Sequence, residues 1–379
     1  MKILILSAST GGGHKRAAAA IENKIKSISP ETEVVTVDAL KAIGKVYDKT
    51  VCEGYYFMAT KIPQVYGGFY KITDQDTPIY KAVMGSNTLM GKKLLKIIED
   101  HSPDAIIICH PFVTTMISKL KHEGKITAKA ISLITDYDTH RTYIVSDMDA
   151  YVLPEPHMAL KLEKEFNVDK KLIYPYGIPI LDKFSEPFDR EALCRRAGLD
   201  PDKRTVLLMA GSFGVTAVLD FYEALAIQGI GLQFIVITGR NRKLFEHIEE
   251  LTEELCTQDN TKLLYFVENV EDYMHIADVI VTKPGGLTVT ESLACHLPLA
   301  IYNAFPGQEQ YNADFLVNTG AAISLHKKNG AKQVIDLLGD TERLNKMKES
   351  CKKLAISDSA EKIFNLAKQL CSTSSEKEI

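Results

Sequence analysis

A run of three glycines and a histidine stands near the start of the chain, at Gly11, Gly12, Gly13 and His14. Glycines at a strand-to-helix turn let backbone amides approach a ligand closely, and the N-terminus of the helix favours an anion. An imidazole at such a turn can take a proton from an attacking hydroxyl, because it titrates near neutral pH. The histidine could instead cap the helix or bond a neighbouring strand, and its position alone leaves both roles open.

Two common phosphate-binding motifs do not fit this turn. The dinucleotide pattern G-x-G-x-x-G needs a glycine where Arg16 stands, so we exclude NAD binding even though Asp38 ends the next predicted strand. A P-loop needs Gly-Lys followed by Ser or Thr, a sequence that this chain lacks.

The second half of the chain contains another glycine turn, Lys283-Pro284-Gly285-Gly286. Thr288 and Glu291 follow it three residues apart and therefore share one face of the predicted helix. A carboxylate there can accept hydrogen bonds from both hydroxyls of a ribose, while the glycines leave room for a diphosphate near the helix N-terminus. The alternative is a glutamate that only favours the start of a helix.

Three further loops, residues 209–214, 266–270 and 306–310, directly follow predicted strands. Each of them alone could be ordinary surface. Because open α/β sheets bind ligands outside the carboxyl ends of parallel strands, their occurrence together favours one nucleotide-binding edge.

Twelve short apolar runs must position these loops, and they alternate with helical stretches. We expect strands at residues 2–7, 33–38, 104–109, 130–135, 150–153, 171–174, 205–210, 233–238, 262–267, 278–282, 298–302 and 321–325. Continuous Val, Ile and Leu runs are typical of parallel strands buried on both faces. The pattern predicts an α/β fold with two Rossmann-like, doubly wound parallel sheets.

Glycine and proline punctuate the chain between the two sets of strands, which predicts a hinge within residues 177–190. We therefore expect one domain at residues 1–183 and a second at 184–355. Residues 356–379 are predicted to form a C-terminal helix and a tail, and the polar tail from residue 372 is expected to be disordered.

One segment, residues 41–96, lacks a strand-like run and carries nine lysines against four acidic residues. Eight aromatic residues are interleaved with them: Tyr47, Tyr55, Tyr56, Phe57, Tyr66, Phe69, Tyr70 and Tyr80. Lysines are attracted to anionic lipid and aromatic side chains suit the headgroup boundary, so we expect this segment to dock on an anionic membrane surface. The alternative is a solvated helical face whose tyrosines pack inward.

The composition of the whole chain excludes several classes of protein. With 379 residues and a formal net charge of −4, the chain suits two globular domains with no general attraction to nucleic acid. Seven cysteines without a CxxC pair indicate reduced thiols. We find no signal peptide and no apolar run of about 20 residues, which predicts a cytoplasmic protein that touches a membrane only from its inner face.

These motifs together resemble the diacylglycerol glycosyltransferases, which include bacterial processive glucosyltransferases and plant monogalactosyldiacylglycerol synthases, and more distantly MurG of peptidoglycan synthesis. The resemblance covers about residues 1–355 and is most specific at residues 11–14, 110–112, 135–140, 283–291 and 306–309. It implies a GT-B fold with two domains facing across a cleft. It also implies inverting transfer of a hexose, glucose being the expected one, from a UDP-sugar to diacylglycerol or glycosyl-diacylglycerol, without a metal or other cofactor.

The resemblance also implies roles for individual residues. The donor site would comprise Gly211, Ser212, Val267, Gly285, Gly286, Thr288, Glu291, Gln308, Glu309 and Gln310. Glu291 would hold the ribose, and the backbone around Val267 the uracil. His14 would be the catalytic base with Asp136 the next candidate, while Gly11, Gly12, Gly13, His110 and His140 would form the acceptor and phosphate loop.

Two features depart from this pattern or offer an alternative to it. Family members often carry a tryptophan a few residues after His140, whereas this chain has none and Tyr143 is the nearest aromatic residue. The sequence Asp136-Tyr137-Asp138 resembles the DxD motif that binds a divalent ion in other glycosyltransferases. It lies in the half expected to bind the acceptor, which favours a local network with His140 instead.

Two other functions fit the same motifs. A UDP-N-acetylglucosamine 2-epimerase-like or MurG-like enzyme would share the architecture, although an epimerase has no use for the surface of residues 41–96. A non-catalytic UDP-sugar sensor would keep its ligand response without His14.

Overall fold

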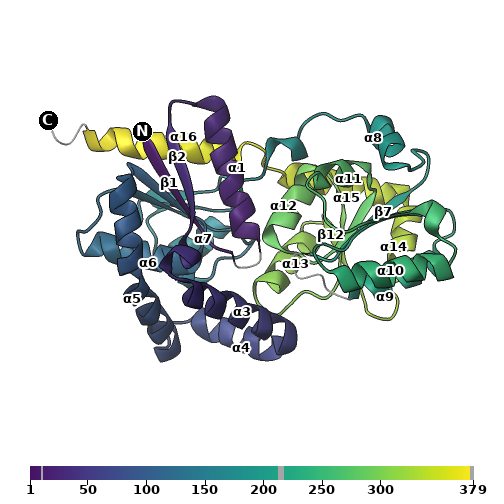
Figure 1. The fold of residues 1–379 in the computed structure, drawn as a ribbon, viewed down its shortest axis with the longest axis horizontal. Helices are drawn as coiled ribbons and strands as arrows, with labels where there is room; N and C mark the ends of the chain where they lie inside the picture. Colours follow the sequence, from purple (N-terminus) through teal and green to yellow (C-terminus); the bar gives the residue numbers. More distant parts are fainter. Residues whose placement is uncertain (10–11, 212–216, 376–379) are drawn as a thin grey trace. The chain divides into compact units, whose positions relative to one another are not determined.

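The computed structural model describes residues 1–9, 12–211 and 217–375, which form two compact units (Figure 1). The N-terminal unit comprises Met1–Leu181, Phe305–Gln308 and the segment from Ile356 onward. The C-terminal unit comprises Asp182–Ala304 and Glu309–Ala355. The first division falls inside the predicted hinge. The sequence-based division nevertheless needs two corrections, because residues 305–308 and the segment from Ile356 onward both belong to the N-terminal unit.

A six-stranded parallel sheet forms the centre of the N-terminal unit. Its strands are β1 (Lys2–Ser7), β2 (Glu33–Asp38), β3 (Ala105–Ile108), β4 (Lys129–Leu133), β5 (Ala150–Val152) and β6 (Ile173–Tyr174), in the order β2-β1-β3-β4-β5-β6. The apolar runs of β1, β3 and β4 are buried among helices that include α1 (Gly13–Ile28), α6 (Pro111–His122) and α7 (Met158–Glu165). The chain goes from β1 outward to β2 and then returns to β3, so the strand order reverses between β1 and β3. Such a reversal is where doubly wound sheets bind ligands.

The last helix, α16 (Ser359–Ser375), packs against α1 and β4 of the same unit (Figure 1). Ser359 donates a 2.8 Å hydrogen bond from its hydroxyl to the carbonyl of Gly177. A Cβ at Gly177, whose φ is +88°, would lie 2.9 Å from the Ile356 side chain, so only glycine fits there. The predicted disorder of the tail was wrong for residues 372–375, because they continue α16.

Residues 39–101 form four helices and no strand: α2 (Ala39–Ile43), α3 (Lys45–Lys61), α4 (Pro63–Thr73) and α5 (Pro78–His101). Pro63 and Pro78 stand in the first turns of α4 and α5, where a missing N–H breaks no hydrogen bond. The hydroxyl of Thr77 accepts a 3.1 Å bond from the backbone N–H of Tyr80 and caps α5. Helix α5 then packs along α6, which fixes this helical insertion on the sheet.

The C-terminal unit repeats the doubly wound plan. Its strands are β7 (Thr205–Met209), β8 (Gln233–Ile237), β9 (Thr261–Leu264), β10 (Val279–Thr282), β11 (Leu299–Ile301) and β12 (Ala322–Ser324), in the order β12-β11-β10-β7-β8-β9. Its helices are α8 (Arg190–Ala197), α9 (Ala217–Gln228), α10 (Arg242–Glu254), α11 (Val270–Ile276), α12 (Gly286–Ala294), α13 (Gln308–Asn318), α14 (Gly330–Gly339) and α15 (Thr341–Leu354). The strand order reverses between β7 and β10.

Each of the twelve predicted strands is present, most of them shorter than predicted by one or two residues. Single 3₁₀ turns occur at Arg141–Tyr143, Lys170–Leu172, Asp182–Phe184 and Gln258–Asn260. Across the described residues, no helix combines the length and the apolar character needed to cross a bilayer.

Candidate active site

Three neighbouring strands of the N-terminal unit place predicted catalytic and acceptor-loop residues at one edge of the sheet. His14 follows β1 at the start of α1, His110 follows β3 as the N-cap of α6, and Asp136 follows β4. Because β1, β3 and β4 are parallel and adjacent, the loops after them meet at the same edge. This edge contains the point where the strand order reverses.

The glycine turn sets the position of His14. Gly12 caps α1 with φ +79°, a left-handed conformation that places Gly13 and His14 in the first helical turn. The imidazole Nδ1 of His14 lies 3.3 Å from the hydroxyl oxygen of Thr135, and the ring also bonds the backbone of Cys109. Gly11 lies outside the described residues.

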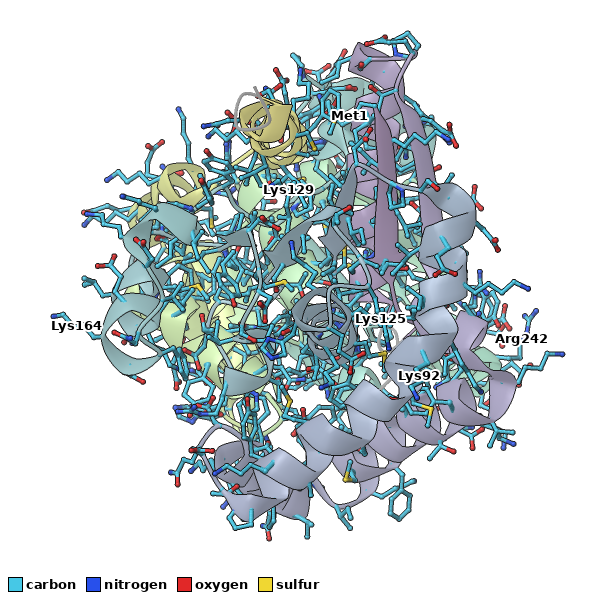
Figure 2. All side chains as sticks on the ribbon, turned by 90° about the vertical axis from the view of Figure 1, so that its left-hand side faces the viewer. Met1, Lys92, Lys125, Lys129, Lys164 and Arg242 are labelled. Atoms are coloured by element: carbon cyan, nitrogen blue, oxygen red, sulfur yellow. The ribbon has the colours of Figure 1, made fainter. Side chains whose placement is uncertain are left out.

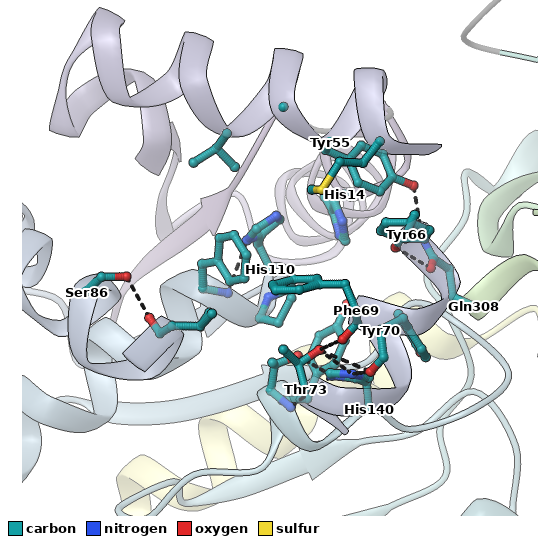
Figure 3. Close-up of a pocket in the computed structure, with 18 of the residues that line it drawn as sticks. His14, Tyr55, Tyr66, Phe69, Tyr70, Thr73, Ser86, His110, His140 and Gln308 are labelled. Atoms are coloured by element: carbon teal, nitrogen blue, oxygen red, sulfur yellow. Dashed lines mark hydrogen bonds between the residues drawn. The ribbon is translucent and has the colours of Figure 1, made fainter. Parts of the chain in front are cut away.

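Burial lowers the pKa of His14 from its ordinary 6.5 to about 4, although the bond to Cys109 acts in the opposite direction. The imidazole is therefore neutral at pH 7, which is the form that can accept a proton. Its ring meets the ring of His110 edge to face, with the centroids 4.8 Å apart (Figure 3).

His110 is neutral as well. Its Nδ1 accepts a 3.3 Å hydrogen bond from the backbone N–H of Phe112, so the ring proton is on Nε2. Burial, and secondly the neighbouring His14, hold the pKa of His110 well below its ordinary value. His110 therefore caps α6 and forms part of the wall beside His14.

The loop after β4 separates the two carboxylates of the DxD-like sequence. Asp138 accepts a 2.9 Å bond from Lys161, whereas Asp136 lines a pocket. His140 donates from Nε2 to the carbonyl of Tyr70 at 2.9 Å, while its Nδ1 accepts a bond from the backbone N–H of Thr142. Both nitrogens of His140 thus connect this loop to α4 and to the following 3₁₀ turn, which is a structural role.

A pocket in the N-terminal unit has a volume of about 410 Å³ and lies beside this edge of the sheet (Figure 3). The predicted residues that line it are His14, His110, Asp136, His140 and Gln308. Helices α3 and α4 supply an aromatic wall made of Tyr47, Tyr55, Tyr66, Phe69 and Tyr70. The pocket therefore has one wall that can exchange protons and one that is largely apolar.

Gln308 is placed differently from its predicted role in the donor site. Its amide oxygen accepts a 2.7 Å bond from the hydroxyl of Tyr66, and its amide nitrogen donates a 2.9 Å bond to the hydroxyl of Tyr55 (Figure 3). Residues 305–308 lie tightly on α4, since a Cβ at Gly67 would be 2.5 Å from Cβ of Pro306. The structure thus makes Gln308 part of the pocket wall in the N-terminal unit.

The predicted nucleotide loops gather at the strand reversal of the C-terminal unit. Gly211 follows β7 with φ +68°, and a Cβ at Gly239 would lie 3.2 Å from the Gly211 carbonyl oxygen. Gly285 is the N-cap of α12 and Gly286 its first residue. The positive end of α12 therefore faces the point where the strand order reverses, as binding of a diphosphate requires. Ser212 lies outside the described residues.

Thr288 and Glu291 follow in α12, where Thr288 is partly exposed and Glu291 is buried. Val267 follows β9, and its neighbour Phe266 is exposed with the guanidinium of Arg240 4.5 Å from the centre of its ring. These positions agree with a nucleotide edge, but the contacts that the resemblance implies for these residues stay predictions.

Lys283 is the residue whose importance the sequence analysis missed. It is only 6% exposed, and its ammonium lies 3.8 Å from a carboxylate oxygen of Glu309. Burial lowers the pKa of Lys283 to about 8, with Glu309 acting in the opposite direction. A buried cation between β10 and the glycine turn can bind a diphosphate, and its place directly before Pro284-Gly285-Gly286 was the available signal.

Helix α13 is hydrogen-bonded to the same glycine turn. Asn312 donates a 2.9 Å hydrogen bond to the carbonyl of Pro284, which holds the first turns of α13 beside α12. Gln310 is exposed, and its amide donates to the carboxylate of Asp314 at 2.8 Å. Glu309, rather than Gln310, is therefore the predicted residue that points to Lys283.

Comparisons with known proteins agree with this geometry. Residues 14–180 match the family model of monogalactosyldiacylglycerol (MGDG) synthase, and residues 192–354 match that of glycosyl transferases group 1. The solved structure of Acinetobacter baumannii MurG superimposes with a TM-score of 0.65 at 14% identity, covering 97% of this chain and 99% of that one. Anabaena HepE in complex with UDP-glucose superimposes with a TM-score of 0.56 at 13% identity, covering 99% and 100%.

The two doubly wound sheets show the GT-B fold, and the match to glycosyl transferases group 1 makes the chain a glycosyltransferase of this class. A processive diacylglycerol β-glucosyltransferase of Bacillus pumilus (strain SAFR-032) is 32% identical over 368 residues, which are 96% of this chain and 93% of that protein. The chain belongs to the family of processive diacylglycerol β-glucosyltransferases. This membership favours a transferase over the epimerase and the sensor.

Proposed function

We propose that this enzyme transfers glucose from UDP-glucose to the free hydroxyl of diacylglycerol, or of its glucosylated product, at a membrane surface. The observation that carries the proposal is the neutral imidazole of His14 in the lining of a pocket that also has an aromatic wall. Such a pocket suits a molecule with one reacting hydroxyl and a large apolar remainder. The named relative of Bacillus pumilus and the UDP-glucose complex of HepE support the choice of acceptor and donor.

The proposed reaction is a single displacement. The acceptor hydroxyl gives its proton to His14, and its oxygen forms a bond to the anomeric carbon. The bond from that carbon to the diphosphate oxygen breaks, and its electron pair leaves with UDP, so the configuration inverts. Lys283 and the N-terminus of α12 place positive potential where negative charge grows on the diphosphate.

A direct assay tests this function. The purified protein is mixed with vesicles that contain diacylglycerol and with one of several UDP-sugars, and the lipid products are separated and identified. We expect β-glucosyl-diacylglycerol from UDP-glucose, followed by products with further glucose units. Formation of free epimerised sugar nucleotide without any glycolipid would contradict the proposal.

Transfer is expected to continue at an unchanged rate after divalent ions are chelated. Asp138 is paired with Lys161, so Asp136 and Asp138 do not act together as an ion-binding pair. The positive groups around the diphosphate belong to the protein itself. The measurement is the glucosylation rate in EDTA and after addition of Mg²⁺ or Mn²⁺. Loss of activity in EDTA that either ion restores would return these two aspartates to the site as metal ligands.

We further propose that helices α3 to α5 dock on the membrane. The lysines Lys45, Lys49, Lys61, Lys71, Lys81 and Lys92 on these helices are exposed, and Lys92 is marked in Figure 2. Eight of the seventeen large hydrophobic side chains exposed among the described residues also lie here, namely Val46, Tyr56, Phe57, Ile62, Val65, Phe69, Ile72 and Ile79. Exposed apolar and cationic side chains on the helices that wall the pocket suit an anionic leaflet.

Replacing Lys45, Lys49 and Lys61 together by glutamate is expected to abolish co-sedimentation with phosphatidylglycerol vesicles at low salt. Each lysine contributes about 1 kcal/mol near an anionic leaflet, and the glutamates add repulsion. We expect glucosylation of vesicle-embedded diacylglycerol to fall together with vesicle binding, whereas UDP binding should stay unchanged. The matched control replaces the exposed lysines Lys327, Lys328 and Lys353, which changes the net charge equally. Equal loss of vesicle binding in both triple variants would show that only total charge matters.

A further inference from the structure

Hydrogen bonds link three side chains in a row, from His14 at the catalytic edge into the interior of the protein. The hydroxyl of Tyr143 lies 3.3 Å from the hydroxyl of Thr135, which lies 3.3 Å from Nδ1 of His14. Thr135 follows β4, Tyr143 ends the 3₁₀ turn Arg141–Tyr143, and His14 is the second residue of α1. This row of hydrogen bonds therefore connects three structural elements at the sheet edge where the reaction is proposed to occur.

Both supporting residues are almost inaccessible to solvent, Thr135 at 4% and Tyr143 at 5%. Burial, and secondly the charge of Asp136, raise the pKa of Tyr143, so its hydroxyl stays protonated throughout the working pH range. Tyr143 thus holds the Thr135 hydroxyl with a hydrogen bond that pH does not alter. Among the residues that line the pocket His14 and Tyr143 appear, but Thr135 does not.

A neutral imidazole can act as a base at only one nitrogen, because the other carries the proton. Which nitrogen carries it depends on the hydrogen bond that the ring makes away from the substrate. A threonine oxygen has two lone pairs, so Thr135 can accept from a ring N–H while it also interacts with Tyr143. The other polar neighbour of the ring is the backbone of Cys109, the residue after β3. Its bond raises the pKa of His14, so it too accepts a ring N–H, and removing the Thr135 hydroxyl separates the two acceptors.

We propose that Thr135, held by Tyr143, is a positioning residue that accepts the Nδ1–H of His14 and so leaves Nε2 as the proton-accepting atom. This inference rests on the proposed role of His14 as the base. During transfer Nε2 gains the acceptor proton while Nδ1 keeps its own, and Thr135 stabilises the resulting imidazolium. His110 and Asp136 are the other ionisable groups at this edge, and the Nδ1 of His110 is engaged by the backbone N–H of Phe112.

The tautomer of His14 can be observed directly in the full-length protein labelled with ¹⁵N-histidine. The His14→Gln variant identifies the His14 signals by their absence. We expect wild type to show the Nδ1–H tautomer and Thr135→Val to show a mixture or the opposite tautomer. If wild type carries the proton on Nε2, or if Thr135→Val leaves the tautomer unchanged, the inference is wrong, whatever the enzyme transfers.

Kinetics give the second readout. Thr135→Val is expected to lower kcat about 10-fold, the effect of one lost hydrogen bond, with KM unchanged for both substrates because Thr135 does not line the pocket. Thr135→Ser restores kcat, and Tyr143→Phe lowers it in the same direction by less. A KM change as large as the kcat change, or no rescue by serine, would indicate a merely structural role.

Thr139→Val is the matched control. Thr139 lies in the same loop, is fully buried, and its hydroxyl makes no hydrogen bond to the described residues. The same isosteric exchange there should leave both the His14 tautomer and kcat unchanged. If His14→Ala proves fully active, the proposed base is wrong, but the tautomer measurement still decides what Thr135 does.

Discussion

Replacing His14 by alanine is expected to lower kcat by about 10²- to 10⁴-fold, the usual contribution of a general base. His14 stands at the strand reversal of the N-terminal unit and lines the pocket, whereas the proposed nucleotide residues belong to the C-terminal unit. Affinity for UDP-glucose should therefore change little. The measurement is a steady-state comparison with vesicle-embedded diacylglycerol, alongside UDP-glucose binding by calorimetry.

Alanine at the exposed His122 is the control, because that side chain is far less enclosed than His14 and pairs with Asp147 at the surface. A His14→Ala enzyme with nearly normal rates would move the base to Asp136, and Asp136→Asn would then be the decisive variant. If the wild-type protein binds UDP-sugars but transfers no sugar, the alternative function as a non-catalytic UDP-sugar sensor would be supported instead.

The pH dependence gives a second view of the same histidine. Because burial lowers the pKa of His14 to about 4, kcat/KM should not fall on its account until the pH approaches 4, whereas an ordinary histidine would titrate at 6.5. The folded-state pKa lies below the unfolded one, so the contribution to stability is complete above 6.5 and is lost as the pH falls towards 4. His14→Ala should reduce the acid sensitivity of the unfolding free energy over that interval.

Replacing Glu291 by alanine is expected to weaken UDP binding by at least about 10²-fold. A hydrogen bond to a charged group is worth about 1.5–3 kcal/mol, and a ribose offers two hydroxyls to the carboxylate. Glu291 is buried in α12, the helix whose N-cap Gly285 lies at the strand reversal. Calorimetric titration with UDP gives the affinity, and kcat at saturating donor should fall much less.

Loss of a buried carboxylate can also disturb folding, so Glu291→Gln is measured in parallel. Glutamine keeps the volume and one acceptor oxygen, and its UDP affinity should lie between wild type and alanine. Glu253→Ala, on the exposed face of α10, controls for removal of a negative charge. Unchanged UDP affinity in folded Glu291 variants would remove this residue from the donor site.

The sequence predicted much of the fold because the relevant signals are local. Apolar runs define buried parallel strands, and all twelve were predicted. Gly12 and Gly211 follow strands at the sheet edges and have φ values of +79° and +68°, which allow a close turn. The family resemblance was likewise confirmed, since its motifs are short stretches of neighbouring residues.

The contacts among the proposed catalytic residues could not be predicted from the sequence, because they join segments that are far apart in the chain. The DxD-like sequence does not show that Asp138 pairs with Lys161 while Asp136 faces the pocket. Nor does the spacing of His14 and Thr135, 121 residues apart, indicate that their side chains meet. That meeting depends on the strand order β1-β3-β4, which is not encoded in either local motif.

By itself, then, the sequence determined the two parallel sheets, the glycine turns and the class of enzyme, because each of these depends on residues close together in the chain. Only the tertiary structure decided that Gln308 lies between Tyr55 and Tyr66, the latter 242 residues away, and that α16 returns to the N-terminal unit. It also placed some aromatic residues of 41–96 on the pocket wall and others on the surface, with Phe69 in both groups. The physical reason is that burial and hydrogen bonding between distant segments are settled by how whole helices pack on a sheet, and a local pattern cannot specify that packing.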